Sequence, residues 1–138
     1  SSGGTVSSGG VLKTANHNYG ASPIATTSGA TVTAIDTTNA ILAGVVAPAS
    51  GNVLLRAYIV TGVAAAGGNF GFVLHGNTTY VGLVNATYPN ANTSVVVTYE
   101  TVVTGLTPGN SYQFDLAYSS GFSAASQLAL INLSAMAA

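Results

Sequence analysis

Residues 94–120, SVVVTYETVVTGLTPGNSYQFDLAYSS, show their local structure more plainly than any other part of the chain. Residues 94–104 are rich in β-branched side chains, and in residues 111–119 large apolar side chains recur at every second position. Both patterns are typical of β-strands, in which alternate side chains share one face. The Gly- and Pro-containing segment between them predicts a tight connection. This stretch therefore predicts two strands joined by a corner.

The corner is expected to carry the chain from one sheet of a sandwich to the other. Its residues are Gly105, Leu106, Pro108, Gly109 and Tyr112. A Tyr at this spacing after a Gly is typical of sandwich corners in which the hydroxyl bonds back to the backbone a few residues upstream. We therefore expect Tyr112 to be buried at the corner, with its hydroxyl bonded to nearby backbone.

The alternative is a direct hairpin, which would place Glu100 and Asp115 opposite each other. Two carboxylates in that position could be an acid pair for glycoside hydrolysis. Like charges on directly opposed residues are destabilising, however. The sheet-crossing corner is the favoured interpretation because it separates the two acids.

Other alternating or apolar segments predict further strands, at residues 31–36, 39–47, 53–61, 69–76, 79–84 and 127–136. A short turn at Gly76 and Asn77 reads as a hairpin. No segment has sustained helical periodicity. The expected fold is an all-β, antiparallel sandwich of about eight strands, jelly-roll-like, over residues 31–138. A fibronectin type III or immunoglobulin-like sandwich is the alternative.

Residues 1–30 are expected to be a flexible or extended N-terminal arm. Residues 1–10 are almost entirely Gly and Ser, which is the composition of a flexible tether. Residues 11–30 hold only scattered apolar side chains. They are either a disordered tail or an arm that becomes ordered on a neighbouring subunit.

Residues 53–61, VLLRAYIVT, predict a strand with two different faces. One face is purely apolar, whereas the other carries Arg56 among large apolar side chains. A lone buried charge is very costly, so a covered Arg56 requires a partner. The expected arrangement is a buried charge pairing of Arg56 with Glu100 or Asp115.

Charged residues are scarce, and this excludes several functional classes. The chain has 2 Lys and Arg against 3 Asp and Glu, or 4 % charged residues, where about 25 % is usual. A net charge of −1 offers no basic surface for nucleic acid. No apolar run reaches the roughly 18 residues of a membrane span. Such a neutral surface tends to associate, so we expect burial in a homo-oligomer or a larger assembly.

Residues able to perform acid–base or metal chemistry are few. The chain has no Cys and 2 His, and no metal-binding spacing. We therefore expect neither an enzyme nor a cofactor or metal site. The best available ligand patch is a set of loop-end amides and aromatics suited to sugar rings, namely His75, Asn77, Tyr80 and Tyr88.

Two phrases carry a resemblance to a known family. Residues 47–56, APASGNVLLR, and residues 102–117, VVTGLTPGNSYQFDLA, resemble the C-terminal domains of minor tail, fibre and head-decoration proteins of tailed bacteriophages, especially of actinobacteria. The resemblance extends over residues 35–136. It implies a jelly-roll-like sandwich, usually trimeric, with a structural or host-attachment role on the virion. Such domains often carry Trp-Lys-x-Ala-His after the Tyr, which residues 113–118 lack. No ligand residue is therefore carried over.

The leading hypothesis is a non-enzymatic virion structural protein. It would oligomerise, as a trimer, through its sandwich, contact other virion proteins and a host-surface glycan, and be anchored by its arm. The first alternative is an extracellular adhesion module, cell-surface or pilus-like, and glycosylated at sequons beginning at Asn77, Asn85, Asn92 and Asn132. The second alternative is a carbohydrate-binding module.

Overall fold

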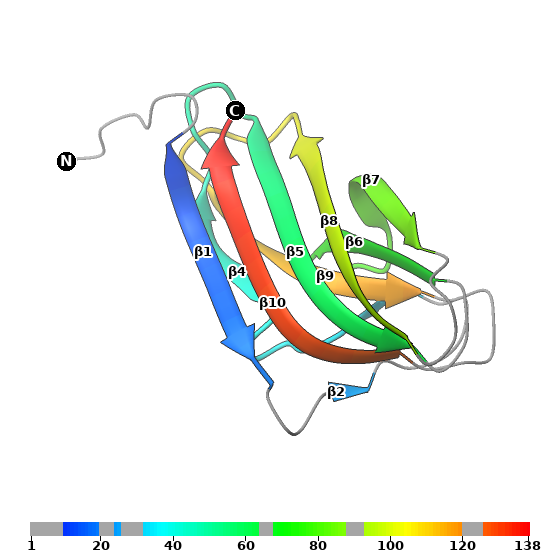
Figure 1. Ribbon diagram of the computed structural model, residues 1–138. Helices are drawn as coiled ribbons and strands as arrows, with labels where there is room; N and C mark the ends of the chain where they lie inside the picture. Colours follow the sequence, from blue (N-terminus) through cyan, green and yellow to red (C-terminus); the bar gives the residue numbers. More distant parts are fainter. Residues whose placement is uncertain (1–9, 20–23, 26–31, 64–67, 88–92, 120–125) are drawn as a thin grey trace.

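The computed structural model describes residues 10–19, 24–25, 32–63, 68–87, 93–119 and 126–138 as two antiparallel β-sheets packed face to face (Figure 1). Sheet A has the order β1, β10, β5, β8. Its strands are β1 (Val11–Asn18), β10 (Ser126–Ala137), β5 (Val53–Val63) and β8 (Thr93–Val103), with the short β2 (Ile24–Ala25) also paired to β10.

Sheet B has β9 and β6 at its centre and β7 at one edge. The short strands β3 and β4 both pair with β9 on its other side. The strands are β3 (Thr33–Ala34), β4 (Ile41–Val46), β9 (Ser111–Ser119), β6 (Gly68–Leu74) and β7 (Tyr80–Thr87).

The strand order identifies the sandwich as a jelly roll. Long strands that follow one another in sequence lie in different sheets, apart from the hairpin of β6 and β7. The two four-strand orders β1-β10-β5-β8 and β4-β9-β6-β7 are those of a double-sheet jelly roll. Immunoglobulin-type sheets place more consecutive strands side by side, so that alternative is excluded. The predicted all-β antiparallel sandwich is confirmed.

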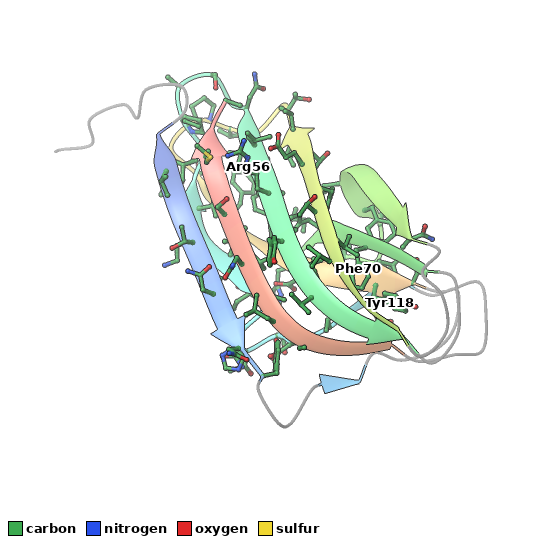
Figure 2. The ribbon with its side chains drawn as sticks, in the orientation of Figure 1. Arg56, Phe70 and Tyr118 are labelled. Carbon is green, nitrogen blue, oxygen red and sulfur yellow. The ribbon has the colours of Figure 1, made fainter. Side chains whose placement is uncertain are left out.

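The core lies between the sheets and follows the strand alternation. In β5, Val53, Leu55 and Ile59 are fully buried, which is the apolar face expected from the sequence. From sheet B, Phe72 and Phe114 enter the same core. Figure 2 labels another pair, Phe70 and Tyr118, whose ring centroids lie 5.0 Å apart. Burial of these aliphatic and aromatic side chains stabilises the sandwich.

The prediction that residues 1–30 form an arm separate from the sandwich is wrong for residues 11–18. They form β1, which pairs antiparallel with β10 of the same chain. An edge strand needs few apolar residues because its ladder hydrogen bonds hold it, and only Leu12, Ala15 and Tyr19 pack partly against the core. Sparse apolar residues therefore gave a false signal of disorder. Of the rest of the predicted arm, Ile24 and Ala25 form β2, and residues 1–9, 20–23 and 26–30 lie outside the described residues.

The corner carries the chain from β8 in sheet A to β9 in sheet B, as expected. The backbone N–H of Thr107 donates to Tyr112 Oη at 3.0 Å, although the Tyr112 ring is only partly buried. This hydrogen bond lowers the pKa of Tyr112. Leu106 N donates to Gly51 O, and a Cβ at Gly51 would lie 2.5 Å from Leu106 O. The two phrases that carry the family resemblance therefore pack against each other.

Candidate functional site

The outer face of sheet A is open and divides into polar and apolar rows. Residues in register across the four strands form each row. We call the two central rows the polar band, which consists of Thr14, Ser134, Arg56 and Glu100 in one row and Asn16, Asn132, Tyr58 and Thr98 in the next. The row at the end nearest the C-terminus is wholly apolar, and we call it the terminal strip: Val11, Met136, Leu54 and Val102.

Arg56 and Glu100 form an ion pair within the polar band. They are direct cross-strand neighbours on β5 and β8, and Arg56 Nε donates to Glu100 Oε1 at 2.8 Å. Glu100 is one of the two partners expected for Arg56, but the side chains are 49 % and 53 % exposed, so the prediction that the pair is buried is wrong. The reason is that nothing within the described part of the chain covers this face. Figure 2 shows Arg56 on it.

A hollow of about 390 Å³ lies over the polar band. Its walls come from all four strands of sheet A and include every residue of the band. Tyr58 is 40 % exposed and presents the largest side chain of the band to solvent. The hollow therefore combines an aromatic ring, amides, hydroxyls and an ion pair.

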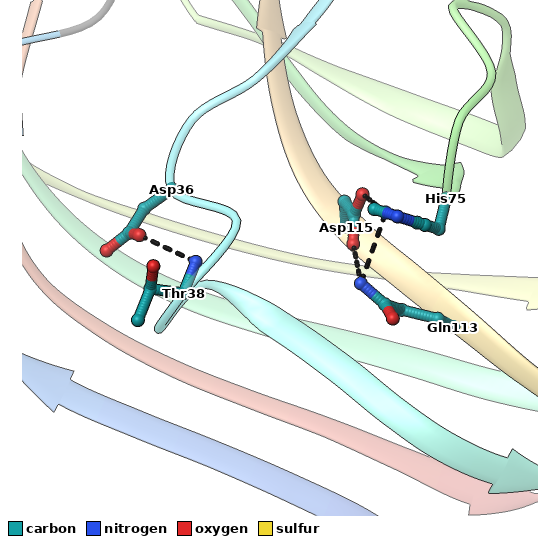
Figure 3. A network of polar contacts seen from close by, with 5 residues as sticks. All are labelled: Asp36, Thr38, His75, Gln113 and Asp115. Atoms are coloured by element: carbon teal, nitrogen blue, oxygen red, sulfur yellow. Dashed lines mark hydrogen bonds and ion pairs between the residues drawn. The ribbon is translucent and has the colours of Figure 1, made fainter.

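The outer face of sheet B carries a second polar network, shown in Figure 3. His75 Nδ1 donates to Asp115 Oδ2 at 2.6 Å, and Gln113 Nε2 donates to Asp115 Oδ1 at 2.9 Å. The Asp115 side chain is 3 % exposed and the His75 side chain 54 %. Asp115 therefore has His75 as its partner and lies in the other sheet from Arg56, so of the two acids expected to pair with Arg56 only Glu100 does so.

The predicted ligand patch does not gather into one site. The side chain of His75 contacts Asp115, whereas Tyr80 Oη lies 2.8 Å from Ser119 Oγ, four positions further along β9. Burial raises the pKa of Tyr80, which is only partly accessible. Asn77 is exposed in the β6–β7 turn. Tyr88 lies outside the described residues.

Asp36 ties the end of β1 to the loop before β4. Its carboxylate accepts hydrogen bonds from Thr38 N (Figure 3), from Asn39 N and Nδ2, and from Tyr19 Oη at 2.8 Å. Burial opposes ionisation here, but these hydrogen bonds outweigh it and lower the pKa of Asp36. Burial of the Tyr19 hydroxyl and its hydrogen bond to Asp36 raise the pKa of Tyr19. This network joins the end of β1 to the loop before β4 and so stabilises the fold.

Other chemical features in the described residues are limited. Those residues contain no group of three His, Asp or Glu side chains that could hold a metal ion. None of their segments is a helix long and apolar enough to cross a membrane. Of the four sequons, Asn77 and Asn132 are exposed, Asn85 lies in β7, and Asn92 is outside the described residues.

Sequence reasoning missed the polar band. Asn132 and Ser134 in β10 and Thr14 and Asn16 in β1 alternate with more buried residues, which is the signal of a strand with one polar face. That signal was available in residues 130–136. The sequence pattern does not reveal the register between strands, which brings the polar residues of the four strands together.

Comparisons with known proteins show the fold and no family. No protein-family model matches the chain, and no curated protein is significantly similar to it in sequence. Among solved structures, PRD1 vertex protein P5 is 11 % identical with a TM-score of 0.50, over 94 % of this chain and 99 % of that one. At this identity the likeness concerns the fold alone.

Two carbohydrate-binding domains also match, with lower TM-scores. The C-terminal CBM6 of LamC, a marine laminarinase from Zobellia galactanivorans, is 19 % identical with a TM-score of 0.44, over 88 % of this chain and 98 % of that one. The CBM22-1 xylan-binding domain of Paenibacillus barcinonensis Xyn10C is 18 % identical with a TM-score of 0.44, over 96 % and 99 %.

Proposed function

We propose that the chain is a non-enzymatic structural module of a virion, in which copies associate into a ring of three through the terminal strip. The observation that carries the proposal is a wholly apolar row across an open sheet. Val11 is 62 % and Val102 48 % exposed at its two ends. In a chain with 4 % charged residues, little electrostatic repulsion opposes contact between copies.

The two ends of the terminal strip differ, which favours a ring over a two-fold dimer. At the β1 edge the strip ends in the exposed side chain of Val11. At the β8 edge, Leu54 and Val102 help to line a hollow of about 460 Å³ that also includes Gly82. A projecting group on one edge and a hollow on the other make a head-to-tail contact, and such contacts form a ring when the rotation between successive copies closes.

The proposal that the chain belongs to a virion has two supports, one from sequence and one from fold. The first is the resemblance of residues 47–56 and 102–117 to phage tail and decoration domains. The second is the jelly-roll fold shared with a vertex protein over nearly the whole chain, which is an analogy of fold. On a particle, anchoring would fall to residues 1–10, which precede β1.

Light scattering of the full chain tests the ring. The expected mass is three times the chain mass of 13.6 kDa. Val11→Ser and Val102→Ser each remove one side of the contact, so each variant alone should be monomeric. Mixing the two variants should give dimers and no trimers, because only one intact contact can form. Val46→Ser, which changes a 50 % exposed valine on sheet B, is the matched control and should remain trimeric.

A monomer at high protein concentration would contradict the ring, as would a trimer that survives both substitutions. The virion setting needs a separate test. Particles that contain the chain should be labelled by antibodies against it in electron micrographs. Labelling of cell surfaces or pili alone would favour the adhesion-module alternative. An intact mass that shows sugars at the sequons would do the same.

A further inference from the structure

We infer that the polar band on sheet A is a binding site for an uncharged oligosaccharide. The band spans four strands, which at the usual spacing of about 4.8 Å gives a width of roughly 14 Å. That width is enough for more than one sugar ring. The hollow above it, about 390 Å³, lies within the size range of ligand sites.

The band presents unused hydrogen-bonding groups at its centre. Within the described residues, the amides of Asn16 and Asn132 and the hydroxyl of Tyr58 make no hydrogen bond, although all three residues line the hollow. Each amide both donates and accepts, as does a hydroxyl. Sugar hydroxyls also both donate and accept, so neighbouring amides and hydroxyls on the protein can form hydrogen bonds with them.

Arg56 and Glu100 add a donor and an acceptor at fixed positions. Their single hydrogen bond joins Arg56 Nε to Glu100 Oε1, and Arg56 Nη1 lies 3.8 Å from Met136 Sδ. Both residues line the hollow, where the guanidinium offers further N–H donors and the carboxylate a second acceptor oxygen. A guanidinium and a carboxylate held side by side suit neighbouring hydroxyls of one ring, and the pair has no net charge.

The exposed Tyr58 ring supplies the apolar contact that a sugar ring needs. An aromatic side chain offers a flat, apolar surface with a polar tip. Tyr58 lies beside Asn132 in the same row, so stacking and hydrogen bonding would act on the same ring of a ligand. The band therefore provides both kinds of contact.

The arrangement favours a sugar over a protein partner. Protein interfaces have an apolar centre and a polar rim. On sheet A the order is reversed, since the polar band lies between the terminal strip and an apolar row of Leu130, Val60 and Val96. Nucleic acid is disfavoured because Arg56 is the only cation of the band and is paired with Glu100.

An NMR titration of the full chain tests the site. Bacterial expression keeps Asn132, the first residue of a sequon, free of attached sugar. The probes are hexasaccharides of β-linked glucose, xylose, mannose and galactose, with a hexagalacturonate as the charged comparison. At least one neutral probe should bind with a dissociation constant on the order of 0.1–1 mM, as expected for an open site. The charged probe should bind more weakly.

Variants locate the binding. Tyr58→Ala should weaken the affinity about tenfold through the lost ring contact. Asn132→Ala should weaken it about fivefold, as expected for the loss of one hydrogen-bonding group. The control is His75→Gln with Asn77→Ala, which alters the sheet B side and should leave affinity unchanged. The inference is overturned if no neutral probe binds at about 10 mM, or if the control weakens binding while Tyr58→Ala does not.

The outcome is independent of the ring. Val11→Ser and Val102→Ser lie outside the polar band and should keep sugar binding while losing association. Tyr58→Ala should weaken sugar binding and keep the trimer. Failure of one proposal would therefore leave the other standing.

Discussion

The outer faces of the two sheets both carry a carboxylate beside a basic side chain, but they differ in how far these groups are buried. Asp115 lies beside His75 on sheet B, and Glu100 lies beside Arg56 on sheet A. On sheet B the carboxylate is buried, because Gln113 and His75 lie over it. On sheet A both partners remain about half exposed.

This difference supports the proposal that sheet A is the contact face. On sheet B, Val73 and Ala117 point outward yet are buried, so the chain's own side chains cover the centre of that face, whereas Val46 on β4 is 50 % exposed. On sheet A, Tyr58, Val96 and Val102 point outward and are exposed. An exposed face with aromatic and apolar groups usually marks an interaction surface. Sheet B thus stabilises the fold, and sheet A is the face proposed for contacts.

The largest expected effect comes from removing each carboxylate in turn. Asp115→Ala deletes the acceptor of two hydrogen bonds and leaves a cavity, and should lower the free energy of unfolding by about 2 kcal/mol. Glu100→Ala removes an exposed ion pair and should cost about 0–1 kcal/mol. Urea unfolding monitored by circular dichroism measures both. Equal losses for the two variants would contradict the contrast between the faces.

A smaller effect should separate two tyrosines. Tyr80→Phe removes the hydroxyl that bonds Ser119 in the closed face, and should cost about 1 kcal/mol. Tyr58→Phe removes a hydroxyl that makes no hydrogen bond within the described residues, and should leave stability unchanged. Thermal unfolding of the two variants compares them directly. A larger loss for Tyr58→Phe would show that the open face also supports the fold.

The smallest effect is expected at low pH, from a network that belongs to neither face. Because the folded-state pKa of Asp36 is lowered, its contribution to stability is present above the ordinary pKa of Asp and is lost as the pH falls through the folded value. Asp36→Asn should therefore flatten the acid limb of a stability–pH curve. Glu100→Gln is the control, and an equal flattening there would remove Asp36 from the explanation.

The sequence predicted the parts of the fold that depend on local patterns. Alternation placed Val53, Leu55 and Ile59 inward, and the Gly and Pro spacing predicted a crossing corner whose Tyr112 hydroxyl bonds back to the chain. It failed at β1, because an edge strand is held by ladder hydrogen bonds that leave little trace in composition. The structure of residues 47–56 and 102–117, which carry the resemblance to phage domains, could be predicted because it also follows from local patterns.

The candidate sites were less predictable because they depend on register between distant strands. His75 and Asp115 are 40 residues apart and meet only through the pairing of β6 with β9. The residues of the polar band lie on four strands and are spread through the sequence from Thr14 to Ser134. Arg56 was correctly expected to need an acid, but whether the pair is covered depends on what lies over the sheet. Strand alternation alone carries no such information.

Methyl NMR of valine-labelled full chain tests directly whether sheet A is the contact face. Spectra are recorded from dilute to concentrated protein, and then with a neutral hexasaccharide. Val11 and Val102 should shift with protein concentration, and Val60, which neighbours Tyr58 along β5, should shift with sugar. Val46, equally exposed on sheet B, should shift with neither. Shifts at Val46 together with unchanged signals from Val11, Val60 and Val102 would contradict the assignment of sheet A as the contact face.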